Sequence, residues 1–126
     1  MTHSTTSEQN YLKALLALSK NGGTIHSADV ANVVGVSRAS VSKAMDILKE
    51  SKYITKEKYG TIALTPLGKQ TASTVKKRNE LIKTFLTDIL GVNDIVANRD
   101  ACRMEHTISS ETAEKLEEYL KNRKVE

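Results

Sequence analysis

The chain has few of the residues that cross-link or interrupt a fold. Among 126 residues there are one proline, one cysteine, six glycines and no tryptophan, and aromatic residues make up 4%. The single cysteine, Cys102, excludes an internal disulfide, so the fold must be stabilised by burial of apolar side chains. The scattered glycines and the lone proline exclude a low-complexity tract or a linker long enough to separate independent modules.

Long hydrophobic runs are also absent. No apolar run approaches the roughly 20 residues that a membrane span requires. The N-terminal region lacks the basic start and hydrophobic centre of a signal peptide, so we expect a cytoplasmic protein with no membrane partner. With 39% hydrophobic and 27% charged residues, the length suits one modest domain or two small ones, which excludes a large multidomain enzyme.

Positive charge is concentrated in the middle of the chain. The net charge is +4, but residues 28–79 carry ten lysines and arginines against four acids, whereas residues 80–126 carry seven against ten. A basic middle followed by an acidic end is typical of a polyanion-binding module joined to a segment with another task. The alternative is an ordinary solvated surface.

Three helices are predicted in the first half of the chain. Residues 8–20 place leucines at helical spacing before Asn21 and two glycines. Ser27 is expected to cap a short helix that Gly35 ends, and Ser37 a longer helix from Arg38 to about Ser51. The short connection between the last two, with its glycine, is typical of a helix-turn-helix.

The outward start of the longer helix carries short hydroxyl side chains, one methyl group and two cations. These residues are Ser37, Arg38, Ala39, Ser40, Ser42 and Lys43. Such side chains can enter a DNA major groove and hydrogen-bond to base edges and phosphates. The alternative is a polar face that contacts only solvent.

A hairpin is predicted next, because Tyr53–Lys58 and Thr61–Leu64 are rich in β-forming residues on either side of Gly60. A helix-turn-helix followed by a hairpin is a winged helix. Cations in or beside the hairpin could contact the DNA backbone, which adds affinity but no sequence reading. They are Lys52, Lys56 and Lys58.

The second half is predicted to be helical. Thr65 and Pro66 start a long helix toward Leu90, with an expected break near Asn79. Asn93 or Asp94 starts another helix that runs to about His106, and Ser109 or Ser110 caps a last one. Some apolar positions exceed what a small core needs and indicate a dimer interface. They are Ile89, Ile95, Val96, Leu116 and Leu120.

Three potential metal ligands follow one another at helical spacing. Cys102, Glu105 and His106 stand at i, i+3 and i+4, so they are expected to share one helix face. A thiolate, a carboxylate and an imidazole could hold a divalent transition metal, whereas the thiolate disfavours magnesium and calcium. The alternative is that Cys102 belongs to the core while Glu105 and His106 form a surface pair.

This order of elements, with the pattern Asp-Ala-Cys-x-x-Glu-His, resembles the metal-dependent repressors of the diphtheria-toxin-repressor and manganese-transport-regulator family over nearly the whole chain. The resemblance implies a regulatory metal site at Cys102, Glu105 and His106, completed by Asn10. It implies iron(II) or manganese(II) as corepressor. The cysteine is similar to the iron-type branch, so iron(II) is expected first and manganese(II) second. The DNA-facing positions it implies are Ser37, Ala39, Ser40 and Lys43.

The sequence also departs from the family pattern. The second metal site of the family uses His, Glu and His where this chain has Asn79, Lys83 and Asn98, so we expect that site to be lost and Lys83 to supply a charge in place of a cation. Asn10 offers a neutral amide oxygen. The chain stops at Glu126, so the SH3-like third domain of larger members is expected to be absent.

We therefore expect a mostly α fold with a small β-hairpin wing. Residues 1–65 would form the winged helix-turn-helix DNA-binding domain, and residues 66–126 the helical metal-binding and dimerisation domain. The implied function is metal-dependent repression of metal-homeostasis genes by a homodimer bound to double-stranded operator DNA. Metal would pin the two parts together, because Asn10 lies in the first part and the other three ligands in the second.

Two alternatives remain open at this stage. One is a metal-independent winged-helix regulator in which Cys102, Glu105 and His106 are structural. The other is an enzyme with Cys102 as a nucleophile activated by His106, but the sequence offers no oxyanion-hole loop and no orienting third group. His3 and His26 are expected to be exposed to solvent rather than to bind metal.

Overall fold

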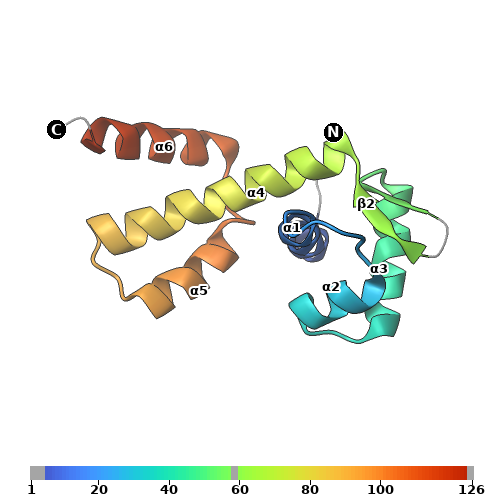
Figure 1. Cartoon of the computed structure of the whole chain (residues 1–126). Coiled ribbons are helices and arrows are strands. Elements are labelled where there is room, and N and C mark those ends of the chain that lie inside the picture. The colour runs from blue at the N-terminus through green and yellow to red at the C-terminus, as the bar shows by residue number, and fades with distance from the viewer. Residues whose placement is uncertain (1–4, 58–59, 125–126) are drawn as a thin grey trace. The chain divides into compact units, whose positions relative to one another are not determined.

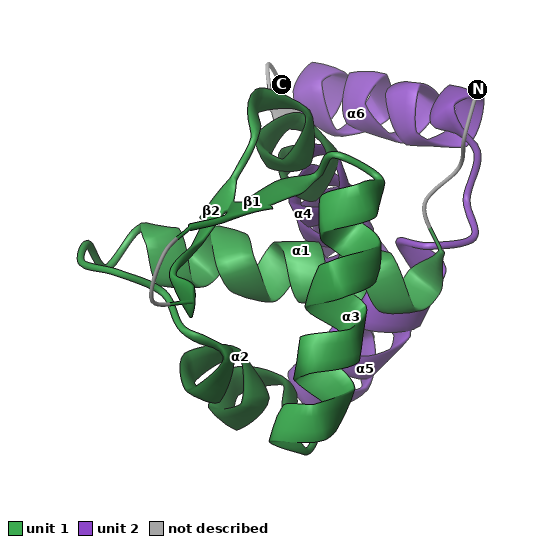
Figure 2. Cartoon of the chain, turned by 90° about the vertical axis from the view of Figure 1, so that its right-hand side faces the viewer, with its two compact units in different colours: residues 1–73 green, residues 74–126 purple. Residues whose placement is uncertain are grey.

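Helices account for most of the structure, and one small antiparallel sheet is the exception (Figure 1). The computed structural model describes residues 5–57 and 60–124. The chain divides into two units, residues 1–73 and 74–126, and the division falls within one long helix (Figure 2). The expected mostly α fold with a small hairpin is confirmed. None of the described helices is long and apolar enough to cross a membrane.

The first unit begins with three helices that surround one apolar core. Each helix turns one side inward, because apolar residues recur every three or four positions along it. The side chains with no exposed surface are Leu12, Leu15, Val30, Val41, Met45 and Leu48. The helices are α1 (Thr6–Ser19), α2 (Ser27–Val34) and α3 (Arg38–Glu50).

The start of α2 differs from the prediction. Ser27 is the first helical residue, and His26 takes the N-cap position. The reason is Asp29, whose Oδ2 accepts a hydrogen bond of 2.9 Å from the backbone N–H of His26. This carboxylate also lies in the first turn, where negative charge complements the helix dipole. The side chain of His26 is exposed, as predicted.

The wing is shorter than the predicted hairpin. Its strands are β1 (Ile54–Lys56) and β2 (Ile62–Leu64), paired antiparallel with Ile54 opposite Leu64. The backbone N–H of Ile62 also donates to the carbonyl of Ile25 at 2.8 Å, which ties the wing to the segment before α2. Tyr53, expected in the first strand, lies before it and is buried.

Thr65 joins the wing to the long helix α4 (Pro66–Thr84). Its hydroxyl donates to the carbonyl of Lys52 at 2.7 Å and accepts from the backbone N–H of Gly68 at 3.1 Å, so it caps the helix as predicted. Gly68 packs directly on the backbone of Tyr53, and a Cβ at this position would overlap the Tyr53 carbonyl oxygen. The residue must therefore be glycine for α4 to start against the wing.

We expect Gly68→Ala to destabilise the protein by about 1–3 kcal/mol, because the added methyl group would push α4 off the rigid Tyr53 backbone. Urea unfolding measured by circular dichroism checks this. The matched control is Ser73→Ala, an exposed position of the same helix, which should leave the midpoint nearly unchanged. Equal midpoints for the two variants would contradict the close packing.

The second unit continues α4 and does not contain the predicted break near Asn79. Instead α4 is regular to Thr84 and is followed by a π-helical turn, η2 (Phe85–Ile89). The hydroxyl of Thr87 donates to the Lys83 carbonyl at 3.0 Å, and the Leu90 N–H reaches back five residues to Phe85 at 3.2 Å. Gly91, with φ of 71°, then ends the helix.

Two capped helices complete this unit. α5 (Asp94–Met104) starts at Asn93, whose Oδ1 accepts the Ile95 N–H at 2.9 Å. α6 (Ser110–Lys124) starts at Ser109, whose hydroxyl accepts the Thr112 N–H at 3.1 Å. The buried apolar core of the second unit joins η2 and the end of α4 to α5. It consists of Ile82, Leu86, Ala97 and Ala101.

Of the five apolar residues expected at a dimer interface, Ile89 is half-buried in η2, and the other four divide into two groups. Leu120 is buried, and Leu116 packs against the core of the second unit. Ile95 and Val96 at the start of α5 are 71% and 44% exposed, and Leu90 just before them is exposed as well. The first group is therefore explained by the core, and only the second leaves apolar surface uncovered.

Neighbouring cations of α4 hold the beginning and the middle of α6. Arg78 donates to the Ile108 carbonyl at 3.3 Å and to the Ser110 hydroxyl at 3.0 Å. Lys77 Nζ lies 2.6 Å from Glu117 Oε2. The hydrogen bond from Lys77 lowers the pKa of Glu117, with help from the charges of Lys77 and Lys121, while burial acts in the opposite direction.

We expect Glu117→Gln to lower the melting temperature at pH 7, and this difference to shrink as the pH falls below the ordinary pKa of a carboxyl group. The folded-state pKa of Glu117 is depressed, so the stabilisation is present above its unfolded-state pKa and is lost as the pH falls through the folded value. Thermal unfolding of both proteins at several pH values checks this. Glu114→Gln, an exposed position of the same helix, serves as the control, and a difference that stays the same at every pH would contradict the pairing with Lys77.

Candidate DNA-binding surface and metal centre

The turn between α2 and α3 has the geometry of a helix-turn-helix. Gly35 adopts φ of 79°, a left-handed conformation that favours glycine, and its N–H donates to the Ala31 carbonyl at 2.9 Å. Val36 and Ser37 follow, and α3 begins at Arg38. The chain thus reverses between two helices within three residues, as the sequence predicts.

The predicted DNA-facing residues are all exposed at the beginning of α3. The buried side of this helix is formed by Val41, Met45 and Leu48, so α3 is held by its apolar stripe while its opposite side faces solvent. The exposed residues are Ser37, Arg38, Ala39, Ser40, Ser42 and Lys43. None carries a large apolar side chain, which leaves the surface free to approach a polar groove.

Ser37 is committed to capping the helix. Its hydroxyl oxygen accepts the backbone N–H of Ser40 at 3.2 Å, and the hydroxyl donates to the Ser40 side chain at 3.0 Å. These two bonds use its proton and one lone pair. Ser37 therefore positions the start of α3, and the Ser40 hydroxyl keeps its own proton available for a partner outside the helix.

The wing cations differ in their surroundings. Lys56 has 28% of its side chain exposed and lies 3.9 Å from Asp46 Oδ1 of α3, so it braces the wing against that helix. Lys52 is exposed and takes a positive φ of 67° at the end of α3. Lys58 lies outside the described residues. Asp46 was not predicted, because only the folded hairpin brings the two side chains together.

The predicted metal ligands lie where α5 ends, and here the prediction of one helix face is corrected. α5 ends at Met104, whose carbonyl accepts N–H groups from Thr107 at 3.0 Å and Ile108 at 3.1 Å, and the Thr107 hydroxyl at 3.1 Å. The backbone tightens there, since the His106 N–H bonds to Arg103 three residues back. His106 therefore belongs to the turn after the helix rather than to its face.

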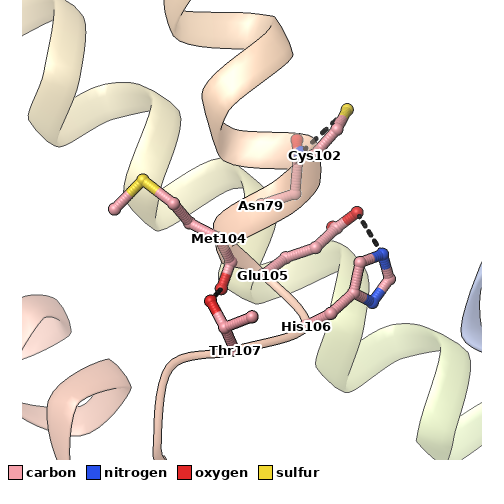
Figure 3. Close-up of polar contacts among 6 residues, drawn as sticks. All are labelled: Asn79, Cys102, Met104, Glu105, His106 and Thr107. Atoms are coloured by element: carbon pink, nitrogen blue, oxygen red, sulfur yellow. Dashed lines mark hydrogen bonds and ion pairs between the residues drawn. The ribbon is translucent and has the colours of Figure 1, made fainter. Parts of the chain in front are cut away.

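Glu105 and His106 lie against each other inside this turn (Figure 3). His106 Nε2 is 3.4 Å from Glu105 Oε1, and their side chains are 4% and 0% exposed, respectively. Burial of a carboxylate costs free energy unless an opposite charge, a hydrogen-bond donor or a metal accompanies it. Glu105 is the one charged residue that is fully buried in the described part of the chain.

Cys102 lies apart from this pair. Its sulfur is exposed, accepts a hydrogen bond from Asn79 Nδ2 at 3.6 Å, and points away from Glu105 and His106 in Figure 3. Within residues 5–57 and 60–124, no three His, Cys, Asp or Glu side chains come close enough together to hold a metal ion. Nothing in the sequence placed Asn79 beside this sulfur, because the two residues stand on different helices.

The remaining predicted residues are dispersed. Asn10 is an exposed residue of α1 in the first unit. Lys83 is half-buried near the end of α4, and Asn98 is exposed on α5. His3 lies outside the described residues.

The donor set nevertheless suits a transition metal. Glu105 offers a carboxylate oxygen and His106 an imidazole nitrogen, and these donors accept iron(II), manganese(II) and zinc alike. They are already adjacent and shielded from water.

Sequence profiles of two protein families match consecutive parts of the chain. The iron dependent repressor N-terminal DNA binding domain matches residues 3–62, and the iron dependent repressor metal binding and dimerisation domain matches residues 65–126. The transcriptional regulator MntR of Geobacillus thermodenitrificans is 31% identical over 105 residues, 83% of this chain and 74% of that protein. The chain belongs to the iron-dependent repressor family. The resemblance inferred from the sequence is thereby confirmed.

Two further similarities agree with this. The diphtheria toxin repressor of Corynebacterium diphtheriae is 28% identical over 112 residues, 89% of this chain and 50% of that protein. The solved structure of the manganese regulator SloR gives a TM-score of 0.81 at 28% identity, covering 96% of this chain and 55% of that one. The repressor-family chain thus spans about half the length of that regulator.

Family membership decides between the classes of function left open by the sequence. Iron-dependent repressors are DNA-binding, metal-dependent transcriptional regulators and not enzymes. The alternative in which His106 activates Cys102 as a catalytic nucleophile is therefore set aside. The winged helix-turn-helix followed by a helical dimerisation part is the architecture of this family, as expected.

We expect Ser37→Ala to cost about 1 kcal/mol of folding free energy, because the N–H of Ser40 loses its cap. Chemical denaturation in the absence of DNA measures this. Ser42→Ala, an exposed serine further along α3, should leave stability within about 0.5 kcal/mol of the parent. If the two variants were equally stable, Ser37 would not be the cap that these distances describe.

Proposed function

We propose that this iron-dependent-repressor-family protein binds double-stranded operator DNA as a homodimer and represses metal-homeostasis genes when a divalent metal is bound. Iron(II) is the first candidate for the corepressor and manganese(II) the second. The observation that carries the proposal is the buried Glu105–His106 pair, because it places a carboxylate oxygen and an imidazole nitrogen, two donors that divalent transition metals accept, side by side and away from water.

The proposed metal ligands are Cys102, Glu105, His106 and Asn10. Glu105 and His106 would hold the ion through an oxygen and a nitrogen that already lie together. Cys102 would join them by turning its side chain inward from its place beside Asn79. Asn10 is included because the family resemblance implies it, and it would supply a neutral amide oxygen from α1.

The choice of iron(II) follows the resemblance of the Asp-Ala-Cys-x-x-Glu-His pattern to the iron-type branch of the family, and the donor set is compatible with it. A thiolate ligand favours iron(II), zinc, nickel or cobalt over the harder manganese(II), although it does not exclude manganese. The similarity to the manganese regulator SloR keeps manganese(II) as the second candidate. Lys83 is proposed to supply a positive charge where relatives hold a second cation.

The proposed DNA contacts come from the beginning of α3 and from the wing. Arg38, Ala39, Ser40, Ser42 and Lys43 would face the major groove, while Ser37 sets the start of the helix. Lys56 and Lys58 would contact the sugar–phosphate backbone from the wing. The boundary proposed between the DNA-binding domain and the metal-binding and dimerisation domain lies between residues 65 and 66.

Exposed apolar side chains support the homodimer. Leu90, Ile95 and Val96 leave uncovered apolar surface at the junction between η2 and α5. A symmetric interface there would cover them in both copies. The α3 helices of the two copies, the recognition helices, could then lie about 34 Å apart and contact two half-sites separated by one turn of DNA.

Metal would act through a coupling free energy. Ligands drawn from α1 and from the end of α5 would fix the DNA-binding part relative to the dimerisation part and so set the spacing of the two recognition helices. By linkage, DNA must tighten metal binding by the factor by which metal tightens DNA binding. A coupling of about 1–3 kcal/mol corresponds to a 5- to 150-fold change in operator affinity.

A metal-independent regulator is the second candidate, and one observation favours it. Cys102 lies apart from the Glu105–His106 pair, so these two residues could serve the fold alone. Such a protein would bind its operator equally well in the presence of a chelator.

The test is anaerobic fluorescence anisotropy with genomic upstream DNA, in chelator and then with iron(II), manganese(II), zinc and nickel at matched free concentrations and fixed salt. We expect one metal to raise the affinity 5- to 150-fold, and Cys102→Ala and His106→Ala to abolish that response while remaining folded dimers. Glu118→Gln, an exposed change on α6, is the control. Full metal dependence in both ligand variants would overturn the proposed site, and equal affinity throughout would favour the metal-independent regulator.

A further inference from the structure

Asn79 and Cys102 form a bond between two helices at the edge of the candidate metal centre. Asn79 Nδ2 donates to the sulfur of Cys102 at 3.6 Å, from α4 to α5 (Figure 3). The thiol is exposed, and its sulfur points away from the buried pair of Glu105 and His106. Asn79 thus engages the one soft donor of the proposed site, whose sulfur points away from the carboxylate and the imidazole.

The Asn79–Cys102 bond joins two helices that share a buried core. Ile82 of α4 and Ala97 and Ala101 of α5 belong to this core, which packs the two helices together. The Cys102 side chain has a single heavy-atom torsion, and rotation about it moves the sulfur without moving either helix. Each orientation gives the sulfur one set of partners, and Asn79 stabilises the outward one.

We propose that Asn79 is a positioning residue that holds the Cys102 sulfur away from Glu105 and His106, and thereby weakens binding of metals that prefer thiolate ligands. This inference rests on the metal site of the proposed function. Zinc and cobalt(II) gain most from a thiolate, whereas manganese(II) prefers oxygen and nitrogen donors. The amide of Asn79 therefore acts on the selectivity of the site and not only on its affinity.

The expected change in metal affinity follows from the strength of one hydrogen bond. Breaking a hydrogen bond of ordinary net strength to free the sulfur weakens binding about two- to tenfold. Binding of a metal by Glu105 and His106 without the sulfur does not require this hydrogen bond to break. Removal of the Asn79 amide should therefore improve cobalt(II) and zinc binding by about two- to tenfold and leave manganese(II) binding unchanged.

The experiment measures metal dissociation constants of the full chain without oxygen or DNA. Cobalt(II), zinc and manganese(II) are the probes, and the thiolate-to-cobalt charge-transfer absorption reports whether the sulfur is a ligand. The variants are Asn79→Leu, which keeps the shape of the side chain but removes the donor, and Asn79→Ala, in case the first does not fold. Asn122→Leu repeats the same change at an exposed position of α6 as a control.

Asn79→Leu should lower the cobalt(II) Kd about two- to tenfold, strengthen the charge-transfer band and leave the manganese(II) Kd unchanged. In a background of Cys102→Ser the same change should have no effect, since the amide acts through the sulfur. Equal gains for all three metals, a gain that persists with Cys102→Ser, or no gain at all would overturn the inference. If the parent protein binds none of these metals, or binds them as well with Cys102→Ala and His106→Ala together, the proposed metal site itself fails.

Discussion

The fully buried carboxylate of Glu105 is the constraint around which the second unit is organised. A buried charge requires a compensating partner, and here the turn after α5 brings the imidazole of His106 to 3.4 Å. In that turn the N–H groups of His106 and Thr107 bond to carbonyls three residues back, at Arg103 and Met104, so the regular α-helix ends at Met104. The end of one helix therefore decides which donors face inward and which, like Cys102, remain outside.

The DNA-binding side depends on a different kind of constraint. α3 is held by an apolar stripe that packs into the first core, so its polar face is presented without any polar contact having to support it. Its start is set by the cap at Ser37, and the wing is set by Gly68, where α4 contacts the Tyr53 backbone. Packing thus fixes the orientation of the surface, on which Arg38 and Lys43 present two exposed positive charges.

Much of this could be predicted from the sequence, because the signals are local. Helix periodicity, the glycine at position 35 and the caps at Thr65 and Asn93 each depend on neighbours within about four residues, so they predicted the helices, the helix-turn-helix and the order of the winged helix. The pattern that ends in Glu105 and His106 likewise identified the family. Local signals failed at Asn79, where a continuous helix outweighs the residue's weak preference for a break.

Only the tertiary structure decided which side chains of different helices and strands contact one another. The spacing of Cys102, Glu105 and His106 gave three donors on one ideal helix, whereas the fold ends that helix early and turns the sulfur toward Asn79. The brace between Lys56 and Asp46 is of the same kind. The sequence by itself determined which chemical groups are available and near which helix end they stand. Which of them meet depends on contacts between residues distant in the chain, because packing of apolar cores, and not the polar residues themselves, sets the distance between helices.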